Sequence, residues 1–62
     1  MGIEVVNIFI NKCIVYFRND SYAEIIKTTL NVIKPKLNKN FIKNMISSAN
    51  SYGLTKIKQC LN

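Results

Sequence analysis

The sequence predicts a small all-α domain: a bundle of three to four short helices at about residues 3–18, 22–34, 41–52 and 55–61. In each segment apolar residues recur at spacings of three and four, the period of an α-helix. Residues that end helices, Pro35 and Gly53, stand between the later segments. With 62 residues, 48% of them apolar, the chain forms one domain, 1–62, with enough apolar side chains for a packed core.

The first segment, IEVVNIFINKCIVYFR (residues 3–18), admits two interpretations. As a helix it gathers its polar residues in one narrow stripe and leaves most of its circumference apolar; the stripe is Glu4, Asn7, Asn11 and Arg18. As a hairpin, residues 5–10 and 13–17 would pair across Asn-Lys, a weak turn beside Asn-Gly. The single polar stripe favours the helix. Because three other short helices can hardly cover so apolar a helix, we expect a homodimer through residues 3–18.

The second helix has a clear start and end. In the segment SYAE (residues 21–24), the hydroxyl of Ser21 can accept the amide of Glu24, whose side chain can return to the amide of Ser21, which makes a capping box. Pro35 disfavours the helical conformation of Lys34, so we expect the helix to end there.

A connector at residues 36–40 leads to the third helix, and either Asn38 or Asn40 can cap it. Gly53 fits the left-handed position that ends a helix. We expect Thr55 to cap the last helix.

The residues around Gly53 resemble three known helix pairs. A DNA-binding helix-turn-helix has a small residue, a turn glycine, a core residue and a helix cap in this order. The sequence matches it with Ala49, Gly53, Leu54 and Thr55. Its second helix would present Thr55, Lys56 and Lys58 to DNA, but the apolar residue expected four places after the cap falls on Gln59. The last helix pair of BTB-type domains and the second helix of ankyrin repeats are similar as well, the BTB match resting on Ala49, Tyr52, Leu54, Ile57 and Cys60. Such a shared pattern indicates a capped helix pair and assigns no family.

The charge is strongly basic and unevenly distributed. The net charge is +6, and the segment from Lys27 to Asn62 holds seven lysines and no acidic residue. Such a field attracts phosphate backbones, anionic membranes or acidic protein surfaces. Because Arg18 is the only arginine, non-specific attraction is favoured over base reading. The predicted nucleic-acid-binding residues are Lys34, Lys36, Lys39, Lys43, Lys56 and Lys58.

The sequence contains few of the residues that catalysis or metal binding would need. The chain has no histidine, only three acidic residues and two glycines, so it lacks the usual general base and a phosphate-cradling loop. Cys13 and Cys60 match no zinc spacing; we expect both to be buried apolar residues, with a disulfide between them as the alternative. We therefore predict a non-enzyme with no catalytic residue, cofactor or metal.

The aromatic side chains are expected in the core rather than as stacking platforms for bases, because five of the six fall on apolar helix faces; the six are Phe9, Tyr16, Phe17, Tyr22, Phe41 and Tyr52.

The resulting prediction is a small, basic, non-enzymatic helical protein that binds nucleic-acid phosphates without strong sequence preference. Alternatives are a protein-protein interaction module, such as a phage- or virus-encoded inhibitor of a host protein, and a membrane-active cationic protein. The abundance of Ile, Lys and Asn indicates an AT-rich coding sequence, which suits a phage or virus and explains part of the lysine excess. Polar residues interrupt the N-terminal apolar stretch, so we expect no integral membrane insertion and a location in the cytoplasm, that of the host if the protein is viral.

Overall fold

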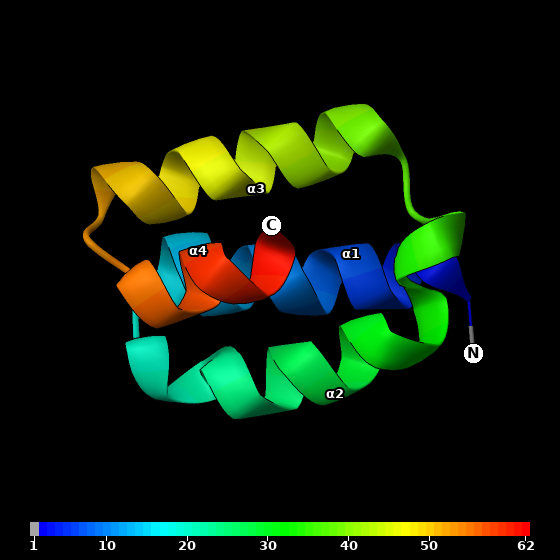
Figure 1. Cartoon of the computed structure of the whole chain (residues 1–62), viewed down its shortest axis with the longest axis horizontal. Coiled ribbons are helices and arrows are strands. Elements are labelled where there is room, and N and C mark those ends of the chain that lie inside the picture. The colour runs from blue at the N-terminus through cyan, green and yellow to red at the C-terminus, as the bar shows by residue number, and fades with distance from the viewer. Residues whose placement is uncertain (1) are drawn as a thin grey trace.

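A computed structural model describes residues 2–62, which fold into four α-helices with one π turn and two 3-10 turns between the first three (Figure 1). The helices are α1 (Ile3–Asn11), α2 (Ala23–Ile33), α3 (Lys39–Ser51) and α4 (Thr55–Leu61). None of these residues lies in a strand. The predicted small all-α bundle is confirmed, and the first segment is a helix rather than a hairpin.

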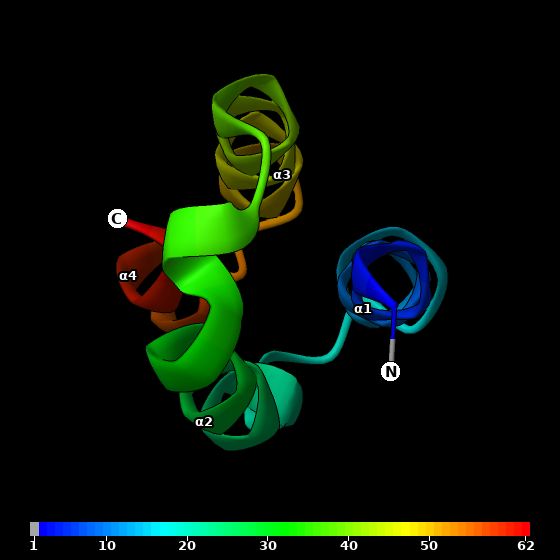
Figure 2. The same ribbon diagram turned by 90° about the vertical axis from the view of Figure 1, so that its right-hand side faces the viewer.

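The four helices surround one core. Viewed along the bundle, α1 and α4 lie on opposite sides, with α3 and α2 between them (Figure 2). α4 packs against both α2 and α3. The largest fully buried side chains come from the first, second and last helices, and α3 adds the fully buried Ala49; the six large ones are Ile10, Cys13, Ile14, Ile26, Ile57 and Leu61. The apolar period of each segment therefore identifies the residues that meet in the core.

The first helix continues beyond α1 as a π turn, Lys12–Tyr16. Its widened hydrogen bond runs from the Phe17 amide to the Lys12 carbonyl, five residues back, at 2.8 Å. The helix ends at Arg18, which adopts a left-handed φ of 51°. The guanidinium of Arg18 lies 4.2 Å from the centre of the Tyr52 ring, so this residue joins the end of the first helix to the end of α3.

Much of the first helix stays uncovered. Val5 and Ile8 are 54% and 56% exposed, and Tyr16 and Phe17 are 75% and 49% exposed. We call these four residues, two on α1 and two at the end of the π turn that continues it, the α1 apolar face. The other three helices of one chain thus cover only part of this helix. Asn7 departs from the expected polar stripe: it is half-buried, and within residues 2–62 its buried Oδ1 has no hydrogen-bond partner.

The predicted capping box at the start of α2 is wrong. Asn19, two residues earlier than expected, accepts the Ser21 amide through its Oδ1 at 3.0 Å and opens a 3-10 turn, Asp20–Tyr22, which leads into α2. Asparagine forms this local turn readily because its carbonyl reaches the amide two residues on. Ser21 therefore lies inside the turn instead of capping it.

Pro35 ends α2, but not in the way expected. The α-helix stops at Ile33, while Lys34 keeps helical dihedrals (φ −51°, ψ −42°). Pro35 occupies the start of a 3-10 turn, Lys34–Lys36, where a missing amide costs nothing. The chain thus makes one more tight turn before it becomes extended at Leu37.

The two ends of α3 follow the sequence prediction. Asn38 caps its start, since its Oδ1 accepts the amides of Asn40 at 2.7 Å and Phe41 at 3.3 Å. At its end Gly53 has φ +71°, and the amide of Leu54 donates to the carbonyl of Ala49 at 2.8 Å. This six-to-one bond is that of a Schellman motif.

Thr55 does not cap α4. The amides of Lys56 and Ile57 donate to the carboxylate of Asp20, at 3.0 and 2.9 Å. The cap of the last helix is therefore supplied by the turn that precedes α2.

The expected burial of the aromatic rings is wrong for Tyr16, Phe17 and Tyr52, which are exposed, while the other three are partly buried. Tyr16 and Phe17 are edge to face, and Phe17 stacks on Tyr22 with ring centres 5.4 Å apart. Tyr16, Phe17 and Tyr22 thus pack on one another, while Phe9, Tyr22 and Phe41 pack against the core as expected.

Candidate nucleic-acid interface

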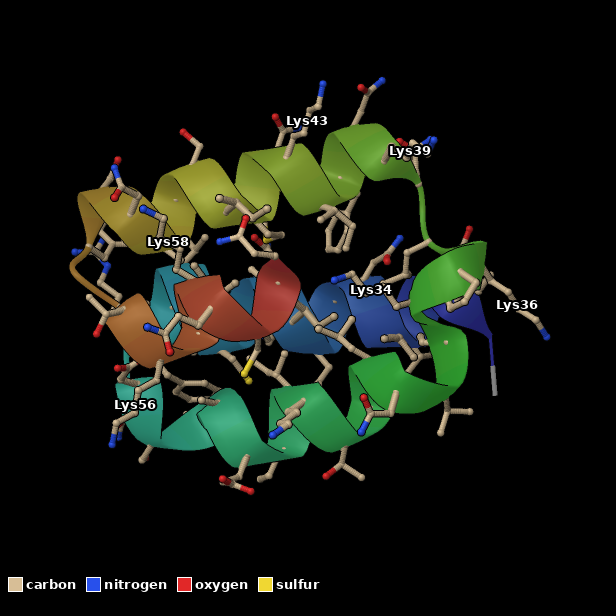
Figure 3. The ribbon with its side chains drawn as sticks, viewed as in Figure 1. Lys34, Lys36, Lys39, Lys43, Lys56 and Lys58 are labelled. Atoms are coloured by element: carbon tan, nitrogen blue, oxygen red, sulfur yellow. The ribbon has the colours of Figure 1, made fainter. Side chains whose placement is uncertain are left out.

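Four of the six predicted lysines gather around the connector between α2 and α3. Lys34 and Lys36 belong to the 3-10 turn, and Lys39 and Lys43 lie one turn apart on α3. Lysines at this spacing share one face of a helix. Figure 3 shows Lys36 and Lys39 at the end of the molecule where α3 begins, with Lys34 and Lys43 closer to its middle.

The local structure brings these lysines together. The Pro35 turn directs the chain back, and the Asn38 cap starts α3 after only two extended residues. Lysines five residues apart in the sequence, Lys34 and Lys39, therefore line the same hollow. We call this the connector hollow; it measures about 340 Å³ and is lined by Lys34, Pro35, Leu37, Lys39, Ile42 and Lys43.

The connector hollow combines apolar walls with a basic rim. Leu37 is buried, Ile42 is half-buried and Pro35 is exposed. The ammonium of Lys34 donates to the backbone carbonyl of Asn62 at 3.1 Å, which holds this lysine near the end of α4.

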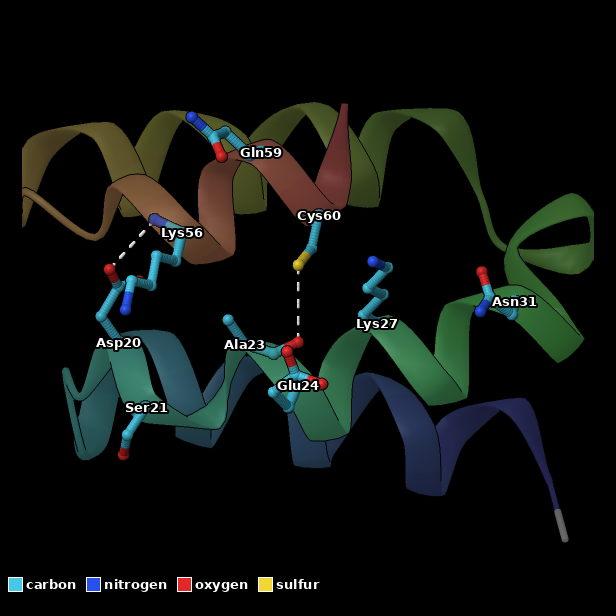
Figure 4. Close-up of a pocket in the computed structure, with 9 residues that line it drawn as sticks. All are labelled: Asp20, Ser21, Ala23, Glu24, Lys27, Asn31, Lys56, Gln59 and Cys60. Carbon is cyan, nitrogen blue, oxygen red and sulfur yellow. Dashed lines mark hydrogen bonds between the residues drawn. The ribbon is translucent and has the colours of Figure 1, made fainter.

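The other two predicted lysines lie on α4, away from the connector (Figure 3). Lys58 is half-buried and donates to Oδ1 of Asn50 at 3.0 Å. Lys56 lines a second pocket, of about 420 Å³, between α2 and α4. Lys27 of α2 lines it too, together with Glu24 and Cys60 (Figure 4). The six lysines therefore form two groups rather than one continuous patch.

The start of α4 is already occupied by a carboxylate. The first amides of a helix bind anions well, and in a helix-turn-helix they approach the DNA. Here two of these amides donate to Asp20 (Figure 4 draws the bond to the Lys56 amide). The α4 backbone is therefore not free to receive a phosphate, which leaves the lysine side chains as the cationic groups of this helix.

Neither cysteine is in a disulfide. Cys13 is fully buried in the core, and burial raises the pKa of its thiol. Cys60 is half-buried, and its Sγ lies 3.4 Å from the carbonyl oxygen of Ala23, to which it donates. The first thiol packs as an apolar residue, while the second borders the pocket between α2 and α4.

Three features of the interface were not predicted from the sequence. The apolar walls Leu37 and Ile42 were not predicted, because Leu37 was assigned to the connector and Ile42 to the apolar face of the third helix. Lys27 was not among the predicted binding residues, yet the packing of α2 on α4 places it in the lining of the same pocket as Lys56. The role of Asp20 depends on a contact 36 residues away along the chain.

Within residues 2–62, no three histidine, cysteine, aspartate or glutamate side chains gather in a group that could hold a metal ion. None of the helices in this part of the chain has the length and apolar character needed to cross a membrane. No protein-family model matches the chain, and neither a curated protein nor a solved structure is significantly similar to it.

Proposed function

We propose that this chain is a small, non-enzymatic protein that binds nucleic-acid phosphates through lysines, with little preference for sequence. The observation that carries the proposal is the convergence of Lys34, Lys39 and Lys43 on the connector hollow, in a half of the chain that has no acidic residue. Lysine is a flexible point charge, which attracts phosphate without the fixed two-pronged geometry that reads guanine. Lys36, Lys56 and Lys58 add to the same positive field.

The proposed role is a binding role in the cytoplasm. No histidine is present, and Asp20 is engaged at the start of α4, so the chain has little to offer as a general acid or base. The free thiols of Cys13 and Cys60 suit a reducing compartment.

The proposal is tested by comparing two substitutions that remove the same charge. Lys43→Gln removes a lysine of the connector hollow, and Lys12→Gln removes an exposed lysine of the first helix. We expect Lys43→Gln to weaken binding of a DNA or RNA oligonucleotide several-fold. It should also reduce the slope of log K against log salt by about one. Lys12→Gln should change binding much less. Equal losses in the two variants would mean that net charge alone drives binding and that the connector is no site.

We also propose that the protein forms a homodimer through residues 3–18. The α1 apolar face exposes two aliphatic and two aromatic side chains, and aromatic residues are enriched at interfaces. Residues 1–26 contain all three acidic residues and only two of the nine basic ones. Two copies can therefore meet through this nearly neutral part of the surface, whereas their lysine-rich halves repel one another.

The same uncovered face favours a second candidate function, an interaction module that docks on another protein, such as a phage- or virus-encoded inhibitor of a host protein. In that case the α1 apolar face would meet the partner, and the lysines would reach an acidic patch on it. A pulldown after nuclease treatment separates the two functions. Recovery of one stoichiometric protein partner favours the inhibitor, and loss of all bound material after nuclease favours nucleic-acid binding.

A further inference from the structure

From the connector hollow we infer a preference for single-stranded over double-stranded nucleic acid, with one unstacked base held between the apolar walls. The inference rests on the proposed function and specifies its ligand. The hollow has about 340 Å³, within the range of roughly 300–1,000 Å³ that is usual for sites that hold small organic groups. A site for phosphates alone needs cations but no apolar walls.

The apolar walls and the basic rim of the connector hollow favour different chemical groups of one ligand. Exposed Pro35 and half-buried Ile42 present aliphatic surface beside the buried Leu37, and covering this surface with an apolar group gains free energy. Lysines stand on both sides of this surface, Lys34 on the turn and Lys39 and Lys43 on α3. The ligand must therefore place an apolar group between anionic groups.

A single strand meets this requirement at every nucleotide. Its bases are unstacked or easily unstacked, and a phosphate stands on each side of every base. A duplex hides the faces of its bases and would leave the apolar walls in water. An acidic peptide needs acidic residues placed on both sides of an apolar one, whereas a strand fits in any register.

The residues that line the hollow also predict tolerance of base identity. They contribute lysine ammonium groups and aliphatic carbon, with no side-chain carbonyl, carboxylate or hydroxyl. Reading of base edges uses paired donors and acceptors, such as those of Asn, Gln and Arg. The long axis of the molecule is 28 Å, so an eight-nucleotide strand is long enough to span it even when stacked at about 3.4 Å per nucleotide.

The affinity part of the test compares three eight-nucleotide probes with the wild-type protein at ~50 mM salt: a mixed-sequence single strand, an abasic strand with the same phosphates, and a duplex. We expect the single strand to bind at least about fivefold more tightly than the other two, which is what covering about 40 Å² of apolar surface contributes. Permuting the base order should leave its affinity within about twofold, because the hollow has no groups that read base edges.

A spectroscopic part reports the base directly, because the chain has no tryptophan. Ile42→Trp places an indole in a wall of the hollow, and Ile25→Trp places one on the exposed surface of α2 as a control. The single strand should quench the fluorescence of Ile42→Trp, the abasic strand should not, and neither should affect Ile25→Trp. Circular dichroism of both variants checks that each keeps the helical fold.

The outcomes separate the two proposals. If the abasic strand binds as tightly as the single strand and leaves Ile42→Trp unquenched, the hollow holds no base, although phosphate binding stands. If no probe binds, the proposed function itself fails. If an acidic peptide with one aromatic residue displaces the single strand and quenches Ile42→Trp as strongly, the inference is overturned in favour of a protein ligand.

Discussion

Asp20 connects two parts of the chain that are distant in sequence. Its two carboxylate oxygens accept the first amides of α4, a helix of only seven residues. A helix so short has little stability of its own, so the cap and the burial of Ile57 and Leu61 hold it in place. Lys56 and Lys58 therefore depend on Asp20 for their position.

Replacing Asp20 should destabilise the protein. Asp20→Ala removes both acceptors, and we expect it to lower the free energy of unfolding by about 1 kcal/mol, the usual effect of losing a cap. Glu24→Ala makes the same change in charge at an exposed position and should change the free energy of unfolding by only about a few tenths of a kcal/mol. Urea unfolding followed by circular dichroism measures both. A loss as large in Glu24→Ala would show that charge rather than the cap is responsible.

Cys13 should give the stability of the fold a dependence on alkaline pH. Burial raises the pKa of this thiol above its ordinary value of 9.0, so the unfolded chain loses the proton first. The buried, protonated thiol makes its full contribution to the free energy of unfolding below about pH 9. That contribution declines as the pH rises from there through the folded-state pKa. Cys13→Ala leaves a cavity and is less stable at neutral pH. The stability difference between wild type and Cys13→Ala should shrink from pH 8 to 10; a constant difference contradicts this account.

At the scale of helices and turns, the sequence predicts local signals well and distant ones poorly. The caps at Asn38 and Gly53 were predicted because each acts on residues two to five positions away. The capping box at Ser21 failed because Asn19 offers the backbone a competing turn two residues earlier. The Asp20 cap could not be predicted, since it requires knowing that α4 returns to the start of α2.

Gly53 offers a test of such a local signal. Its φ of +71° strains any residue with a Cβ, although no atom lies within 4 Å of where that Cβ would stand. We expect Gly53→Ala to lower the free energy of unfolding by about 1 kcal/mol through backbone strain alone. Gly2→Ala is the matched control, because Gly2 has a negative φ and an added Cβ has room. If both variants are equally stable, the left-handed turn does not carry this cost.

At the scale of the whole molecule, the six predicted lysines and the α1 apolar face lie on different elements. The radius of gyration is 10.2 Å, close to the value of about 10.6 Å expected for a compact domain of this length. None of the six predicted lysines comes from the first helix, which carries the α1 apolar face (Figure 3). Composition predicted the basic character, and the sequence positions of Lys34, Lys36, Lys39 and Lys43 placed them around the connector. The packing shows that three of these, Lys34, Lys39 and Lys43, line the connector hollow.

The proposed dimer predicts a change in mass. At micromolar concentration the wild type should elute in size-exclusion chromatography with light scattering as a species of about twice 7.1 kDa. Ile8→Gln places a polar amide in the α1 apolar face and should shift the protein toward monomer without a change in charge. Asn11→Gln, on the exposed polar side of the same helix, should leave the dimer intact. A monomeric wild type rules out the dimer.

The central claim, that the lysines bind nucleic-acid phosphates, is tested most directly by a salt titration of oligonucleotide binding. Each phosphate that a lysine neutralises in a single strand contributes about 0.7 to the slope of log K against log salt, so six lysines predict a linear decrease with a slope of up to about 4. We expect measurable binding at ~50 mM salt and a steep loss by about 200 mM. Absence of binding at ~50 mM salt, or an affinity that salt does not change, would contradict the claim.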